Sequence, residues 1–195
     1  MPDPSATVMT DVRERAARIR LACFDVDGTL TDGRLLFDTE GRELKAFHVH
    51  DGQGLVLLRK CRIAVALVTA RVSTIAERRA AELGIEHVHT AVPDKLECVR
   101  GIAQRLGLGL DEVAFMGDDL PDLRVMQHVG LAAAPADAHA WVASRVHWRS
   151  DAAAGAGAAR AFCDLLLDAQ GHAARLLEAA TSLDTAAIAP TGRES

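Results

Sequence analysis

The sequence predicts a doubly wound α/β domain, in which helices cover both faces of a parallel β-sheet. Short apolar runs of the length of buried strands alternate with segments of helical periodicity from residue 21 onward. Strands joined through helices in this way form right-handed crossovers and parallel sheets. A length of 195 residues suits one domain with a sizeable core. We therefore expect one domain over residues 21–180, a lead-in over residues 1–20 and a disordered tail over residues 181–195.

Cap and turn residues set the expected borders of these elements. Gly84 ends one helix, Asp94 and Glu97 form a capping box for the next, and Pro121 opens a third. The expected strands are residues 21–24, 63–69, 85–89, 113–116, 130–133 and 145–148. The expected helices are residues 73–83, 94–106, 121–128, 137–142, 158–169 and a last one reaching residue 180.

Two segments lie outside this alternation. Before the first strand, Thr10 is expected to cap a short helix with three apolar residues on one side, Val12, Ala16 and Ile19. After it, two short apolar runs around a glycine-containing turn predict a β-hairpin flap over residues 34–50. Gly52 and Gly54 are expected to precede a helix over residues 55–61.

Composition argues against several classes of partner. The formal net charge is −5, from 22 basic and 27 acidic residues, and without a basic tract it gives no reason to expect nucleic acid. The longest strongly apolar run, residues 63–68, is far shorter than the roughly 20 residues that cross a bilayer. The first twenty residues carry charges where a secretory signal needs an apolar segment. We expect a cytoplasmic protein with neither a membrane nor a nucleic-acid partner.

Cysteine, histidine and tryptophan side chains are interpreted as structural. The widely spaced cysteines are expected to be reduced core residues: Cys23, Cys61, Cys98 and Cys163. Two histidine pairs have the spacing of metal ligands but no third ligand nearby, so a strand or flap position is favoured for His48 with His50 and for His87 with His89. Core or subunit-contact positions are expected for Trp141 and Trp148.

The chain is organised around residues 22–33, where an apolar strand ends in two acids. Asp25 and Asp27 are two positions apart, so their side chains point the same way on an extended backbone. Like charges this close suggest Mg²⁺, with one acid as nucleophile and the other as proton carrier. Gly28 and Thr29 add a backbone amide and a hydroxyl that suit a phosphate. A solvated acidic turn is the plain alternative, and this stretch alone does not decide between the two.

Three other strand ends carry groups that fit the same chemistry. Thr69 is followed by the turn amides at Ala70, although a threonine there could equally cap a helix. Lys95 lies in the first turn of a helix, where a cation opposes the helix dipole, although a solvated lysine is common. Asp118 belongs to three nearby acids that would repel one another without a cation. Ligands of parallel sheets bind beyond the carboxyl ends of the strands, so we expect these groups to meet in one pocket.

In their order and type, these four segments resemble the motifs of the haloacid dehalogenase superfamily of aspartyl-phosphate phosphatases. The resemblance implies that Asp25 attacks phosphorus, while Asp27 protonates the leaving oxygen and later activates water. It implies Mg²⁺ bound by Asp25, the backbone carbonyl of Asp27, and Asp118. The expected phosphate-binding residues are Gly28, Thr69, Ala70 and Lys95.

The 44 residues between Asp25 and Thr69 leave room only for the hairpin, so the chain resembles the capless members of this superfamily. Over residues 21–170 it is similar to the 3-deoxy-D-manno-octulosonate 8-phosphate phosphatases of lipopolysaccharide synthesis. The similarity rests on DGTLTDG at Asp27, KAFHVHDGQG at Lys45, LGIEHV at Leu83, GDDLPDLRVM at Gly117, ADAHAWV at Ala136 and CDLLL at Cys163. It implies a phosphorylated sugar acid as substrate and a homotetramer whose hairpins complete neighbouring sites.

Departures from that pattern concern the substrate. Three arginines usual in the family are replaced here by His50, Val56 and Ala156. The expected substrate-binding residues are Asp27, His48, His50, Asp51, Gly52, Arg71, Arg79 and Lys95. Two alternatives stay open: another sugar phosphate such as a nonulosonate 9-phosphate, and a non-catalytic phosphate-binding or oligomerising domain. The presence of both Asp25 and Asp27 argues against the second.

Overall fold

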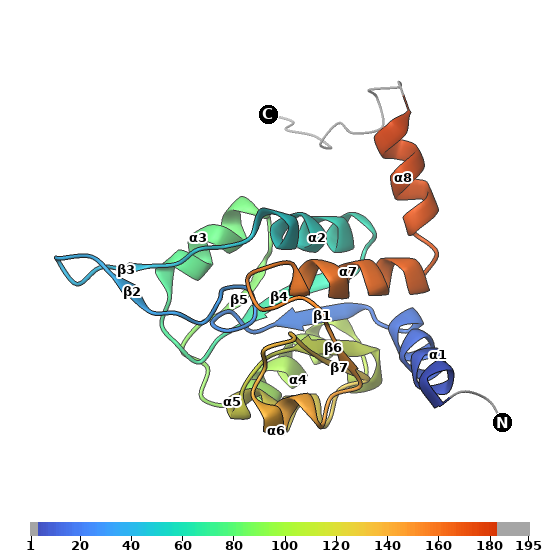
Figure 1. Cartoon of the computed structure of the whole chain (residues 1–195), viewed down its shortest axis with the longest axis horizontal. Coiled ribbons are helices and arrows are strands. Elements are labelled where there is room, and N and C mark those ends of the chain that lie inside the picture. Colours follow the sequence, from blue (N-terminus) through green and yellow to red (C-terminus); the bar gives the residue numbers. More distant parts are fainter. Residues whose placement is uncertain (1–3, 183–195) are drawn as a thin grey trace.

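A six-stranded parallel sheet forms the centre of the computed structural model, which describes residues 4–182 (Figure 1). The strand order is β5-β4-β1-β6-β7-β8. Their bounds are β1 Leu21–Phe24, β4 Ala64–Val68, β5 His87–His89, β6 Val113–Met116, β7 Leu131–Ala134 and β8 Trp148–Arg149. The central strand β1 pairs with β4 on one side and β6 on the other. The predicted doubly wound α/β architecture is confirmed, and its expected strands recur within a few residues.

Helices cover both faces of this sheet and enclose two cores. One face carries α1 Pro4–Ala17, α2 Val49–Lys60, α3 Thr74–Glu82 and α7 Ala158–Ala169. The other carries α4 Lys95–Leu106, α5 Leu120–Met126 and α6 Ala140–Ala143. Side chains of β1 alternate between the two cores: Ala22 and Phe24 join the first, Leu21 and Cys23 the second. Both faces of β1 are therefore buried, which explains its uniformly apolar sequence.

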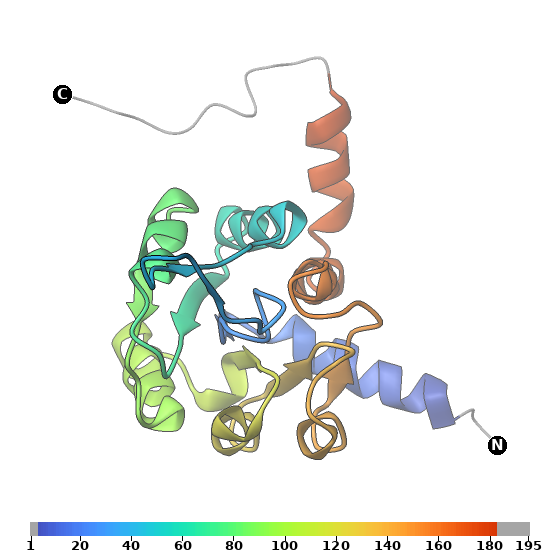
Figure 2. The ribbon, with the colours of Figure 1, turned by 60° about the vertical axis from the view of Figure 1, so that its left-hand side comes forward.

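Three further elements lie at the margins. The hairpin of β2 Leu36–Phe37 and β3 Glu43–Leu44 projects from the body as predicted (Figure 1). The 3₁₀ helix η1 Leu110–Glu112 leads into β6. The last helix, α8 Ala173–Thr181, extends away from the end of α7 (Figure 2) and contains no buried residue. The predicted disordered tail falls, from residue 183, outside the described residues.

The prediction for the start of α2 is wrong. The helix begins at Val49, so it takes in the end of the expected hairpin and places Gly52 and Gly54 inside the helix. Both glycines allow close approach of neighbours. A Cβ at Gly52 would lie 2.3 Å from an Arg79 guanidinium nitrogen, and one at Gly54 would lie 3.0 Å from the Cβ of Cys163. Glycine here reflects packing between helices and not a turn.

Smaller corrections concern other borders. Helix α1 begins at Pro4 and runs through Thr10, because proline suits a first helical turn. Asp94 caps α4 as expected, but the Glu97 carboxylate accepts a hydrogen bond from Arg100 at 2.7 Å. Strand β8 and helix α6 each begin three residues later and end one residue later than predicted.

The cysteines and tryptophans lie where expected, but the prediction of a strand or flap position for His48 and His50 is wrong, because both lie at the start of α2. All four cysteines are free thiols; Cys98 is half-buried and the other three are buried. Trp148 stacks on Phe162 in the core, with ring centroids 5.5 Å apart, whereas Trp141 is 60% exposed. Within residues 4–182, no helix combines the length and apolar character needed to cross a bilayer.

Candidate active site

A cavity of about 290 Å³ opens beyond the carboxyl ends of β1, β4 and β6. The sheet register explains this position, because Phe24 lies opposite Leu67 of β4 and Met116 of β6. Residues that follow these three strands therefore emerge side by side. The cavity is lined by Asp25, Asp27, Gly28, Gly33, Thr69, Ala70, Arg71, Lys95, Asp118, Asp119, Pro121 and Asp122. The structure thus brings together all four sequence segments predicted to meet.

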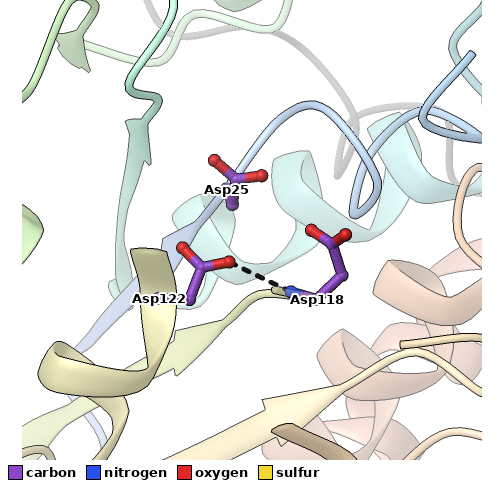
Figure 3. Close-up of side chains that lie close together, drawn as sticks. All are labelled: Asp25, Asp118 and Asp122. Atoms are coloured by element: carbon purple, nitrogen blue, oxygen red, sulfur yellow. Dashed lines mark hydrogen bonds between the residues drawn. The ribbon is translucent and has the colours of Figure 1, made fainter. Parts of the chain in front are cut away.

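Three carboxylates lie close together in this cavity (Figure 3). Asp25, Asp118 and Asp122 each place an oxygen within 4.8 Å of the others. Burial, followed by repulsion from Asp122, raises the pKa of Asp25 to about 7. Burial and the same neighbour also raise the pKa of Asp118 to about 7. Crowded anions of this kind are stabilised by a cation.

The donor set suits a hard divalent cation such as Mg²⁺. Buried carboxylate oxygens are the ligands such an ion prefers. Gly28 keeps the space beside Asp118 open, because a Cβ there would lie 2.2 Å from Asp118 Oδ2. Thr29 Oγ1 donates to Asp118 Oδ1 at 3.3 Å and orients that carboxylate. Asp25 and Asp118, both predicted as metal ligands, are therefore close enough to share one ion.

Lys95 supplies the positive charge at the base of the cavity. Its Nζ donates to Asp25 Oδ1 at 2.5 Å and to Asp122 Oδ1, and the residue is 6% exposed. Burial alone would lower the pKa of Lys95, but attraction by Asp25 and Asp122 outweighs it and raises the pKa. The Asp94 cap fixes the first turn of α4, from which Lys95 projects. We call Asp25, Lys95, Asp118 and Asp122 the inner ion cluster.

Asp122 is one of the three nearby acids noted in the sequence, but the sequence predictions gave it no role in the site. Its Oδ2 accepts hydrogen bonds from the backbone N–H groups of Asp118 and Asp119, at 3.1 and 3.3 Å. Its other oxygen accepts from Lys95. With both oxygens engaged, Asp122 orients the turn after β6 and anchors Lys95. The signal was present in the sequence, because an acid three residues after an N-cap residue can accept hydrogen bonds from backbone N–H groups at the start of the helix.

A second group of charges lies around Asp27. Lys45 Nζ donates to Asp27 Oδ1 and lies 3.4 Å from Glu43 Oε1. Arg71 Nη2 donates to the same Glu43 oxygen at 2.8 Å, and Arg71 Nε lies 3.8 Å from Asp27 Oδ2. We call Asp27, Glu43, Lys45 and Arg71 the outer ion cluster. Lys45 and Glu43 were missed, although their spacing of two on an extended strand could have placed both on one side.

The predicted residues around the start of α2 and in α3 lie outside this cavity. His48, His50, Asp51, Gly52 and Arg79 are absent from its lining. Asp51 is buried, and its carboxylate accepts the backbone N–H groups of Arg160 and Gly157 at the start of α7, at 2.7 and 3.3 Å. Burial raises the pKa of Asp51, and Arg79 packs over the ring of Phe47. Within one chain, Asp51 therefore joins α2 to α7, and a substrate role for these residues stays a prediction.

Comparison with known proteins places this geometry in a family. No protein-family profile matches the chain. A 3-deoxy-D-manno-octulosonate 8-phosphate phosphatase of Escherichia coli is 43% identical over 164 residues, which cover 84% of this chain and 87% of that protein. The chain belongs to the 3-deoxy-D-manno-octulosonate 8-phosphate phosphatase family. The predicted resemblance to haloacid dehalogenase enzymes is confirmed.

Solved structures agree with this membership. A hypothetical protein from Xanthomonas campestris is 53% identical, with a TM-score of 0.86, over 88% of this chain and 94% of that chain. A phosphatase of the same family from Moraxella catarrhalis was solved with magnesium, phosphate and 3-deoxy-D-manno-octulosonate. It is 36% identical, with a TM-score of 0.85, over 87% of this chain and 97% of that chain. The family fold therefore extends over nearly all of the described residues.

Proposed function

We propose that this protein is a Mg²⁺-dependent phosphatase that hydrolyses 3-deoxy-D-manno-octulosonate 8-phosphate to the free sugar acid and phosphate. The observation that carries the proposal is the inner ion cluster, where Asp25 and Asp118 lie together beside the ammonium of Lys95. The family relatives, named for this reaction, support the choice of substrate. The cavity volume of about 290 Å³ fits a small phosphorylated molecule.

In the proposed mechanism, an Asp25 carboxylate oxygen attacks phosphorus as the ester bond breaks. The leaving alkoxide takes a proton from Asp27, which gives the free sugar and a phosphorylated Asp25. Asp27 then takes a proton from the attacking water, whose oxygen adds to phosphorus and releases inorganic phosphate. Asp25 and a protonated Asp27 are thereby regenerated. Division through a covalent intermediate replaces one difficult displacement by two easier ones.

Residues around Asp25 would balance the negative charge of the phosphoryl group. Lys95, fixed by Asp122, lies where it can balance negative charge on the transferred group. Thr69, buried at the end of β4, and the backbone amides near Ala70 and Gly28 would hold phosphoryl oxygens. Asp25, the Asp27 backbone carbonyl and Asp118 would hold Mg²⁺, which supplies Lewis-acid stabilisation of the phosphoryl charge.

The same proposal includes a homotetramer in a reducing cytoplasm. The hairpin exposes four apolar side chains, Leu35, Leu36, Phe37 and Leu44, each at least 47% exposed. An apolar patch on a projecting element favours burial against other copies. Such packing would also cover a cavity that no cap domain closes within the described residues. The four free thiols support a reducing compartment. We further propose that residues 21–180 act as one catalytic domain.

A second substrate class deserves a direct test. His50 and Ala156 stand where the family carries arginine, so a different phosphorylated sugar acid, such as a nonulosonate 9-phosphate, is the alternative. Purified protein with Mg²⁺ should be assayed for phosphate release from a panel that contains both esters. We expect the highest kcat/KM for the octulosonate ester, and no release by Asp25→Asn. Preference for the nonulosonate ester would change the substrate, and activity retained by Asp25→Asn would refute the mechanism.

Asp151→Asn is the matched control, because Asp151 is exposed and lies outside the cavity. It should keep wild-type activity. Circular dichroism of both variants would show whether the substitution altered the fold.

A further inference from the structure

The outer ion cluster contains a lysine that the proposed mechanism does not use. Lys45 follows β3 at the base of the hairpin, and its side chain is only 2% exposed. Its ammonium contacts two carboxylates, Asp27 and Glu43. An ammonium removed from water is costly unless it is paired, so this lysine is held in place by its partners. Burial of such a group in a projecting hairpin calls for a functional reason.

The location of Lys45 separates it from the substrate. Arg71 of the same cluster is 42% exposed and lines the cavity, whereas Lys45 is covered and is absent from the lining. A ligand in the cavity can therefore meet Arg71 but not the Lys45 ammonium. Any influence of Lys45 on the reaction passes through Asp27, the residue it contacts.

The contacts of Asp27 differentiate its two oxygens. Oδ1 accepts the Lys45 hydrogen bond, while Oδ2 is buried and has no hydrogen-bond partner among the described residues. Arg71 Nε lies 3.8 Å from Oδ2. The hairpin contact at Oδ1 therefore fixes the orientation of the carboxylate.

We propose that Lys45 is a positioning residue that fixes the orientation of the Asp27 carboxylate through Oδ1. This rests on the proposed function. In the first step the O–H bond of the Asp27 carboxyl group breaks, its proton passes to the leaving alkoxide oxygen, and its electron pair stays on the carboxylate. Glu43 and Arg71 complete the arrangement, because Glu43 accepts from Arg71 and lies against Lys45. The hairpin thus contributes to catalysis within its own chain as well as to any contact between chains.

Dependence on the leaving group tests this role. An alkyl phosphate needs a proton from the acid as its ester bond breaks, whereas 4-nitrophenyl phosphate releases a stable anion and hardly needs one. For Lys45→Met we expect kcat/KM to fall by about a hundredfold with an alkyl ester and by less than about threefold with 4-nitrophenyl phosphate. Lys45→Arg, which keeps the charge, should recover most of the alkyl-ester activity. Asp27→Asn should show the same selectivity, and adding Lys45→Met to it should cause little further loss.

Lys60→Met is the matched control, because Lys60 is an exposed lysine at the end of α2, and it should leave both activities unchanged. Equal loss with both esters, or no loss, would overturn the inference. If Lys45→Met does not fold, Glu43→Gln replaces it and should show the same selectivity between the two esters, with a smaller loss of kcat/KM. Wild-type protein that hydrolyses neither ester would instead refute the proposed function.

Discussion

The inner and outer ion clusters each place one buried lysine between two carboxylates, yet they are built from different parts of the fold. Lys95 projects from the capped first turn of a twelve-residue helix and contacts Asp25 and Asp122. Lys45 follows a two-residue strand of a projecting hairpin and contacts Asp27 and Glu43. The core thus holds the groups proposed to act at phosphorus, while the hairpin holds the acid proposed to act at the leaving group. A local change in the hairpin can therefore alter proton transfer by Asp27 while it leaves the groups around phosphorus in place.

Loss of Lys95 should give the largest effect. For Lys95→Met we expect kcat to fall by about a hundredfold or more with alkyl and aryl esters alike, because charge at phosphorus is lost for every substrate. This equal loss contrasts with the selectivity expected for Lys45→Met. Steady-state kinetics of Lys95→Met with both esters measure the loss. A Lys95→Met variant with selectivity like that of Lys45→Met would show that the two clusters do not divide the reaction.

Binding of Mg²⁺ should depend on pH at the inner cluster. Burial raises the pKa of Asp25 and of Asp118 to about 7 in the metal-free protein, so both retain protons at pH 6. Metal ligands must be deprotonated, so Mg²⁺ displaces protons and binds more tightly as pH rises. We expect about tenfold or greater tightening between pH 6 and pH 8 by isothermal titration calorimetry, with proton release seen in buffers of different ionisation enthalpy. An affinity independent of pH would contradict the ligand assignment.

Shortening the hairpin tip should separate assembly from chemistry. Removing residues 38–41 leaves Glu43, Lys45 and the exposed apolar side chains in the chain but deletes the turn that joins β2 to β3. We expect sedimentation velocity to show smaller species and the activity to fall by several-fold, about tenfold at most, because other copies no longer cover the cavity. Unchanged sedimentation would remove the hairpin from the proposed subunit interface.

The smallest expected effects are changes in unfolding free energy, compared between one aspartate substitution near the inner cluster and one in the hairpin. Asp94→Ala removes the cap of α4 and should lower the free energy of unfolding by about 1 kcal/mol. Asp38→Ala, in the exposed hairpin turn, removes hydrogen bonds to Arg42 and should leave the unfolding free energy unchanged. Urea denaturation of both variants measures the difference. A larger loss for Asp38→Ala would mean that the hairpin shares the stability of the core.

The inner cluster was largely predictable, because its residues follow short apolar strands directly. Asp25 directly follows β1, and Asp118 is the second residue after β6; both strands are evident from their apolar sequence. Parallel strands bring such positions to one edge by geometry alone. Asp122 was missed because its role is to bind Lys95 and two backbone amides, contacts that exist only after β6 and α4 have met.

The outer cluster and the start of α2 were less predictable. Lys45 lies 18 residues from Asp27, and their contact depends on how the base of the hairpin meets the turn after β1. From the sequence, Gly52 and Gly54 resemble helix breakers, whereas in the structure Arg79 and Cys163 pack against them inside a helix. Local sequence contains no information about side chains that pack against it from another helix.

The sequence by itself determined the strands, the order in which reactive side chains follow them, the family and the kind of reaction. These features depend on residue type and on spacing along the chain. Only the tertiary structure decided the pairing of each charge. Electrostatic energy depends on distance in space, and burial at the sheet edge gave Lys95 and Lys45 their separate carboxylate partners.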